Sequence, residues 1–239
     1  MNIAVIFAGG SGKRMRSGDI PKQFLEIKGK PIIIHTLELF EQNSNIDAIV
    51  IACKEDWIDN LKDLIAKFGI SKVRSIVPGG KTGQLSIYNG LKAAEEIDSN
   101  AVVLIHDGVR PLIDQKVIDD NIASVKKHGS AITTSVVTET ILVVSEAEEI
   151  ETVPDRSRSR VAKAPQSFYL QDVLAAHNRA LAEGRDDFID TCTMMKYYGH
   201  KLFLVDGPYE NIKITTPDDY LICKILIGDR EDLNASEDL

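Results

Sequence analysis

Cysteines are scarce in this sequence, and none of them stands in a pairing pattern. The 239 residues include three, Cys53, Cys192 and Cys223, which are separated by long stretches of chain. A zinc motif needs cysteines a few residues apart, and an odd number of thiols disfavours a disulfide framework. We therefore interpret the three as small core residues of a protein from a reducing compartment.

Long hydrophobic runs and an excess of positive charge are also missing. No stretch reaches the ~20 apolar residues of a bilayer-spanning helix, and the apolar residues 3–7 end at glycines instead of continuing as a signal peptide. Lys and Arg total 28 against 36 Asp and Glu, and the net charge of −8 argues against non-specific binding to nucleic acid. We expect a cytoplasmic protein that binds neither nucleic acid nor a membrane.

Two familiar nucleotide-binding motifs are absent as well, although a glycine loop follows the first apolar run. A P-loop would need glycine at position 7 and a hydroxyl residue at position 14, where this chain has Phe7 and Arg14. The dinucleotide-binding fingerprint fails at Met15, where a small residue is required. The loop therefore has to be interpreted from its own residues.

The loop at residues 8–15, Ala-Gly-Gly-Ser-Gly-Lys-Arg-Met, has the composition of a phosphate-binding turn. Glycines let backbone N–H groups approach an anion, while Lys13 and Arg14 supply positive charge. A further cation, Lys22, follows within Pro21-Lys22-Gln23. By itself, the segment also fits a surface turn with solvated cations.

Apolar runs of strand length alternate with helical patterns, which is typical of an α/β fold with a mostly parallel sheet and helices on both faces. We expect a single domain over residues 1–228 and a frayed acidic tail over 229–239. Helices are predicted at 170–183, 189–197 and near 217–227, and a strand at 202–205. The first strands are predicted at 3–7, 48–53, 73–77 and 101–105. Turns at 8–15, 78–84 and 106–111 follow strands, so we expect them to share one cleft.

The region around residues 138–165 departs from this pattern and predicts a projecting β-arm. Strand-like runs at 131–137 and 141–144 flank a polar turn, and an acidic stretch then precedes the basic run 156–160. Opposed charges on a projecting arm favour exchange with a partner subunit. A solvated loop is the alternative.

Three further groups of residues carry candidate chemistry. Asp107 follows a buried strand, where a carboxylate beside a phosphate loop can bind magnesium; a turn or N-cap role, a common use of Asp, is the alternative. Arg110 can pair with Asp107 or reach a phosphate, and we interpret His106 as structural. Gly80 and Ser86 can line a nucleotide base, or simply form a turn before a helix. Lys213 precedes a helix and can point into the cleft, or remain a surface charge.

Taken in order, these segments resemble the cytidylyltransferases of the methylerythritol-phosphate and ribitol-phosphate type over nearly the whole chain. The resemblance implies a Rossmann-like domain whose β-arm swaps across a homodimer, and transfer of CMP from CTP to a polyol phosphate with Mg²⁺. The matching segments are residues 8–15, Pro21-Lys22-Gln23, Gly79-Gly80, residues 106–111, Ala164-Pro165-Gln166 and Asn211-Ile212-Lys213.

The resemblance also implies roles for individual residues. Catalysis would fall to Arg14, Lys22 and Lys213. The residues implied to bind CTP are Ala8, Gly9, Gly10, Gly12, Gly80, Ser86 and Arg110. Those implied to bind the acceptor are Thr140, Arg156, Asp107 and Lys213, with Thr140 and Arg156 acting on the neighbouring subunit's site, and Asp107 is also implied as the metal ligand.

Some positions depart from the family pattern and bear on the acceptor. Gly83 stands where family members usually carry Arg, Ala164 where they often have Thr, and Glu139 where Asp is common. Val109 resembles the ribitol-phosphate branch, so we expect ribitol 5-phosphate, with methylerythritol 4-phosphate as the alternative. A non-catalytic nucleotide-binding protein and a nicotinamide-dependent dehydrogenase are alternatives from other classes; intact Arg14, Lys22 and Asp107 disfavour the first, and the missing fingerprint disfavours the second.

Overall fold

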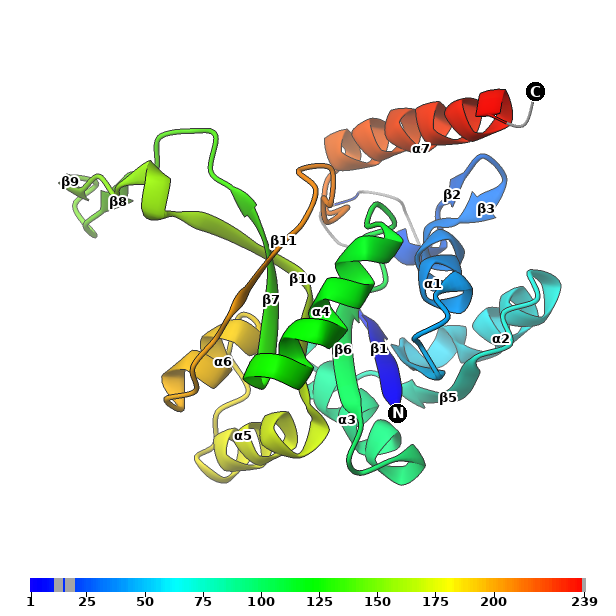
Figure 1. Ribbon diagram of the computed structural model, residues 1–239, viewed down its shortest axis with the longest axis horizontal. Coiled ribbons are helices and arrows are strands. Elements are labelled where there is room, and N and C mark those ends of the chain that lie inside the picture. Colours follow the sequence, from blue (N-terminus) through cyan, green and yellow to red (C-terminus); the bar gives the residue numbers. More distant parts are fainter. Residues whose placement is uncertain (11–14, 16–19, 238–239) are drawn as a thin grey trace.

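A seven-stranded sheet forms the centre of the molecule, with strand order β11-β7-β10-β6-β1-β4-β5 (Figure 1). The structure is a computed structural model and describes residues 1–10, 15 and 20–237. The strands are β1 (Asn2–Ala8), β4 (Ala48–Cys53), β5 (Val73–Pro78), β6 (Val102–Asp107), β7 (Ser130–Val136), β10 (Arg160–Tyr169) and β11 (Leu204–Asp206).

Most neighbouring strands of this sheet run parallel, as predicted. β1 is parallel to β4 and β6, β4 to β5, and β7 to β11, whereas β10 is antiparallel to both of its neighbours. The carboxyl ends of β1, β5 and β6 therefore lie at the same edge of the sheet, which is where open α/β sheets bind their ligands.

Side chains of the central strands alternate between two apolar layers. In β1, Ala4 and Ile6 belong to one buried cluster, and Ile3 and Val5 to the other. Helices α1 (Ile32–Gln42), α2 (Ile58–Lys67) and α4 (Gln115–His128) complete the first layer, and α3 (Gly83–Ile97), α5 (Leu170–Ala182) and α6 (Thr191–Tyr197) complete the second. This confirms helices on both faces, and explains why the strands read as unbroken apolar runs.

A third, smaller cluster lies beside the sheet, under the C-terminal helix α7 (Pro217–Glu237). It joins Cys223 and Ile227 of α7 to Ile27 of a short hairpin. The remaining short elements are β2 (Glu26–Ile27), β3 (Lys30–Pro31), η2 (Lys22–Phe24) and η3 (Glu55–Trp57).

Helix α7 starts as predicted but ends later than predicted. The Thr216 hydroxyl accepts a hydrogen bond from Asp219 N at 3.3 Å, and the Asp219 carboxylate accepts one from Thr216 N at 2.8 Å, which is a reciprocal cap. The predicted end of this helix near residue 227 was wrong, because the backbone stays helical to Glu237, while the acidic tail as a separate segment stays a prediction. No proline follows Pro217 to interrupt the helix.

The segment between β7 and β10 projects from the sheet as an arm (Figure 1). It contains the antiparallel pair β8 (Val143–Val144) and β9 (Ile150–Thr152), followed by η4 (Arg156–Arg158). Residues 160–165, predicted to belong to the arm, lie instead in β10, where Arg160–Ala162 pair with β7. The side chains of Arg160 to Ala162 are exposed there and those of Lys163 to Pro165 are buried, so only the exposed end of this strand looks like an arm in sequence.

None of the three cysteines, all of them among the described residues, lies in a disulfide. Cys53 and Cys223 are buried, and Cys192 is half-buried. Across the part of the chain that the structure describes, no helix is both long and apolar enough to cross a bilayer.

Candidate active site

The cleft consists of two adjoining cavities at the carboxyl edge of the sheet, with volumes of about 470 and 270 Å³. Ala8 to Gly10 and the Gly80–Gly83 turn line the larger one, the glycine half. Residues of β10, α5 and α6 line the smaller one, the β10 half. Asp107 and Lys213 line both, so they stand where the two halves meet. The predicted meeting of the three turns is confirmed for their described residues.

The glycine half depends on close packing between two turns. A Cβ on Gly9 would lie 2.9 Å from the Ser86 hydroxyl oxygen, and a Cβ on Gly80 would lie 2.3 Å from Leu85 Cβ. The Ser86 hydroxyl accepts from Gly80 N at 3.0 Å and donates to Thr82 O at 2.9 Å. Ser86 therefore holds the turn in shape at the edge of the cavity, and its contact with a base stays a prediction.

Lys22 and Gln23 connect the first turn to the opposite wall. Gln23 is buried and donates to Ala8 O at 2.6 Å, which fixes the start of the glycine loop. Lys22 lines the glycine half, and its ammonium donates to Ile214 O at 2.7 Å. The Pro21-Lys22-Gln23 motif thus delivers a positive charge to the cavity and anchors the loop that bounds it.

Asp107 is the electrostatic centre of the cleft. Arg110 Nε donates to one carboxylate oxygen at 2.7 Å, and the Lys213 ammonium lies 2.6 Å from the other. Burial opposes ionisation of Asp107, but the Lys213 and Arg110 charges prevail and lower the pKa of its carboxyl to about 2. The carboxylate stays charged near neutral pH and holds both cations in place at the junction.

The segment that carries Lys213 is fixed to the rest of the cleft by its backbone. Asn211 is fully buried and donates to Ala164 O at 2.7 Å, while Arg110 Nη1 donates to Asn211 O at 3.0 Å. The Lys213 side chain is 42% exposed and its ammonium lies 5.6 Å from the Phe7 ring centre. The prediction that Lys213 points into the cleft is confirmed by this placement.

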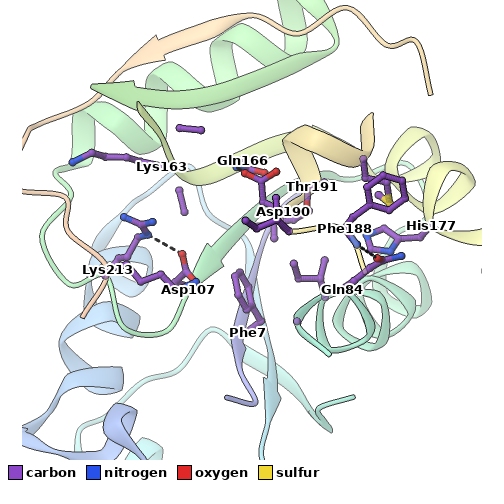
Figure 2. Close-up of a pocket in the computed structure, with 18 residues that line it drawn as sticks. Phe7, Gln84, Asp107, Lys163, Gln166, His177, Phe188, Asp190, Thr191 and Lys213 are labelled. Atoms are coloured by element: carbon purple, nitrogen blue, oxygen red, sulfur yellow. Dashed lines mark hydrogen bonds and ion pairs between the residues drawn. The ribbon is translucent and has the colours of Figure 1, made fainter. Parts of the chain in front are cut away.

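The β10 half extends from the charged junction to an apolar end. Figure 2 shows Asp107 and Lys213 at one end and His177, Phe188 and Gln84 at the other. Gln166 lies between them, where it donates to Asp190 at 3.0 Å and accepts from Cys192 N at 2.7 Å. Sequence reasoning missed this end, because His177 comes from α5 and Phe188 from the loop between α5 and α6, and neither segment carries a motif.

His106 lies behind the junction and does not contact the cavity. It is fully buried, and burial lowers the pKa of its imidazole to about 4. One ring nitrogen lies 3.0 Å from Arg110 O, and the ring packs edge-on against Phe40. These contacts agree with the structural interpretation of His106, which supports the turn that carries Arg110.

Four further residues were predicted to belong to the site. Gly12 and Arg14 fall outside the residues that the structure describes. Thr140 and Arg156 lie in the arm and line neither cavity of their own chain; Arg156 donates to Thr138 O at 3.1 Å. The roles of all four stay predictions.

The three departures from the family pattern differ in their surroundings. A Cβ on Gly83 would meet no atom within 4 Å, so the site has room for a larger side chain. Ala164 is buried and lines the β10 half, where its methyl group offers no hydrogen bond. Glu139 is exposed on the arm.

The residues of the cleft can bind magnesium when phosphates and water supply the ion's other ligands. Among the described residues, no three His, Cys, Asp or Glu side chains gather closely enough to bind a metal. Among the described residues that line both halves of the cleft, Asp107 is the one with a carboxylate, and each of its oxygens has a lone pair beyond the bond it accepts. Magnesium in phosphate sites commonly takes one or two carboxylates and completes its shell with phosphates and water. Asp107 meets that requirement.

Comparison with known proteins gives consistent results. The family model described as IspD, 2-C-methyl-D-erythritol 4-phosphate cytidylyltransferase, matches residues 2–229. A protein of Vibrio parahaemolyticus serotype O3:K6 named ribitol-5-phosphate cytidylyltransferase is 55% identical, covering 98% of this chain and 99% of its own. A protein of Streptococcus agalactiae serotype III with the same name is 53% identical over 97% of both chains.

More distant relatives have a second name. A 2-C-methyl-D-erythritol 4-phosphate cytidylyltransferase of Clostridium botulinum (strain Langeland) is 39% identical, covering 92% of this chain and 95% of its own. The crystal structure of 4-diphosphocytidyl-2C-methyl-D-erythritol synthase from Anaerococcus prevotii superposes with a TM-score of 0.82 at 28% identity, covering 95% of this chain and 96% of that one. By fold, family model and these identities, the chain belongs to the IspD family of cytidylyltransferases.

Proposed function

We propose that the protein transfers CMP from CTP to ribitol 5-phosphate and releases pyrophosphate. The observation that carries the proposal is the Asp107 junction, where Arg110 and Lys213 are held between a glycine-lined cavity and a second cavity. A nucleotide in the first cavity and a phosphorylated acceptor in the second would meet there. The names of the relatives at 53–55% identity support the choice of acceptor.

The chemistry requires positioning and charge stabilisation. A phosphate oxygen of the acceptor attacks the α-phosphorus of CTP, a new P–O bond forms, and the bond to the β-phosphate breaks so that pyrophosphate leaves. The nucleophile is already anionic, so no general base is needed. Lys22, with Arg14, would stabilise the triphosphate charge as the leaving group departs, and Lys213 would hold the acceptor's phosphate.

Magnesium is part of the proposal. The ion, bound with the triphosphate, would neutralise charge on the phosphates, and Asp107 is the residue that would hold it. Asp107 has a second task that needs no metal, because its carboxylate keeps Lys213 and Arg110 aimed at the place where the two substrates meet.

The arm is the basis for proposing a homodimer. Ile150 and Val144 expose 60% and 54% of their surface on an arm that has no layer to bury them. We include in the proposal a homodimer in which the arm brings Thr140 and Arg156 to the partner's cleft, and a cytoplasmic location, where CTP is available. Surface polymers built from ribitol phosphate units would be the destination of the product.

Methylerythritol 4-phosphate is the second candidate acceptor, favoured by the family model and by relatives at 39% identity. The deciding experiment is pyrophosphate release with CTP and magnesium, measured with each acceptor. The proposal expects a kcat/KM at least tenfold higher for ribitol 5-phosphate. The reverse preference would assign the protein to the second candidate, and release with neither would refute both.

A further inference from the structure

Lys163 is a buried cation in the cleft that none of the sequence motifs includes. It is 8% exposed, lies in β10 one residue before Ala164, and lines the same cavity as Arg110 and Lys213. The pairing of β10 with β7 is interrupted between Ala162 and Gln166. In Figure 2 the side chain extends on the Lys213 side of the cavity, away from His177.

None of the polar contacts of Lys163 among the described residues is with a carboxylate. Its ammonium donates to Tyr209 O at 2.7 Å and lies 5.3 Å from the Tyr209 ring centre. Within the described residues, no carboxylate comes within 4 Å of it, whereas most buried lysines are paired. Two of its three N–H groups have no protein acceptor among those residues.

The surroundings of Lys163 disfavour its charged form when no anion is bound. Burial lowers the pKa of the Lys163 ammonium and the nearby Arg110 guanidinium lowers it further, while the charge of the Glu210 carboxylate opposes this shift without reversing it. Asp107 is the carboxylate at this end of the cavity, and both of its oxygens are used by Arg110 and Lys213. An anion bound beside Lys163 would offset both the cost of burying its charge and the repulsion from Arg110.

We infer that Lys163 is an acceptor-binding residue that contacts the phosphate monoester of the polyol, together with Lys213 and Arg110. Arg110 was expected at CTP, but it lines the β10 half and is absent from the lining of the glycine half. Lys163 lines the β10 half and is absent from the lining of the glycine half, so its anion belongs to the acceptor and not to CTP. The inference rests on the proposed function and adds to it a binding group supplied by the same subunit, besides the residues expected from the partner's arm.

The test uses Lys163→Gln, which keeps an N–H donor for the Tyr209 carbonyl while removing the charge. We expect the KM for ribitol 5-phosphate to rise about 10- to 100-fold, as for loss of a charged hydrogen bond, with the KM for CTP changed less than twofold. Lys163→Arg should recover most of the loss. Lys201→Gln removes the same charge from an exposed position before β11 and should behave as wild type.

Inorganic phosphate gives a second readout that does not depend on the identity of the polyol. Phosphate should inhibit the wild type competitively against the acceptor, and the inhibition constant should rise about tenfold in Lys163→Gln. An unchanged acceptor KM, or a rise in the CTP KM alone, would overturn the assignment. A wild type without activity on ribitol 5-phosphate refutes the proposed acceptor only; loss of phosphate-induced thermal stabilisation in Lys163→Gln would still support the anion site.

Discussion

The cleft and the arm both contain charged residues, but these residues differ in their burial and in their contacts. In the cleft, charged groups are buried and tied to one another, as Asp107 is to Arg110 and Lys213. In the arm, Arg156 is exposed and contacts a single backbone carbonyl. The cleft is therefore shaped by contacts within one chain, whereas the charged groups of the arm are free to contact the partner subunit that we propose.

The apolar residues show the same contrast. β6 is buried over its whole length, between two layers of helices. β8 and β9 are exposed over their whole length and pair only with each other. An isolated two-stranded ribbon has marginal stability in water, so the arm would gain stability from a surface that covered it. A second copy of the chain is the proposed surface.

The largest expected effect is loss of a charge stabiliser from the cleft. We predict that Lys22→Ala, and likewise Arg14→Ala, lowers kcat about 10²- to 10³-fold, as expected when one preorganised charge is removed from the transition state. Steady-state pyrophosphate release measures it, with Lys201→Ala as the matched control. Turnover close to that of wild type would remove the residue from the triphosphate site.

Next in size is the arm's contribution to the partner. Arg156→Ala should raise the acceptor KM about tenfold or more and leave the CTP KM unchanged. If arms reach across the dimer, mixing Lys22→Ala with Arg156→Ala subunits creates heterodimers with one intact cleft, and activity should recover to about a quarter of wild type. No recovery after subunit exchange would place the arm at its own cleft, and a monomeric mass in light scattering would exclude the dimer.

Lys213→Ala tests the junction between the two halves of the cleft. We expect the acceptor KM to rise about tenfold with a smaller change in the CTP KM, since this contact forms before the chemistry. Lys224→Ala is a suitable control, because Lys224 lies exposed on α7. An unchanged acceptor KM would remove Lys213 from the acceptor site.

A smaller effect concerns acid stability of the cleft wall. His177 is buried with both ring nitrogens unpartnered, and burial lowers the pKa of its imidazole to about 4 from 6.5. Below pH 6.5 the unfolded chain takes up a proton that the folded chain refuses until about pH 4, so stability falls as pH falls through this window. His177→Leu should remove about 2 kcal/mol of the loss between pH 7 and pH 5. Urea unfolding at pH 5 and pH 7 measures it; an unchanged difference between the two pH values would contradict it.

The smallest effect compares two helix caps. Asp114 accepts from Val117 N at 2.8 Å at the start of α4, and Asp155 accepts from Ser157 N at 2.9 Å at the start of η4. Asp114→Ala should lower the free energy of unfolding by about 1 kcal/mol. Asp155→Ala, in the exposed arm, should produce no measurable change. Equal losses would show that the arm unfolds together with the sheet.

Much of the fold and the glycine half of the cleft follow from local sequence patterns. β4 has the predicted bounds, and β1 and β5 each extend the predicted run by one or two residues. Strand runs and glycine turns are short-range signals, so the cleft at the carboxyl edge was predictable once the strands were placed. The end of α7 was not, because its last residues contain neither a proline nor a strong stop signal.

The sequence by itself determined the α/β class, the glycine-lined turns and the identity of the cations, because each depends on residue type and spacing within a few positions. Only the tertiary structure decided which charges meet. Lys213 pairs with Asp107 although 106 positions of the chain separate them. Lys163 lines the same cavity from an antiparallel strand, and no sequence motif predicts a cation there. Pairing at long range is set by how the elements pack, and a local pattern contains no record of that packing.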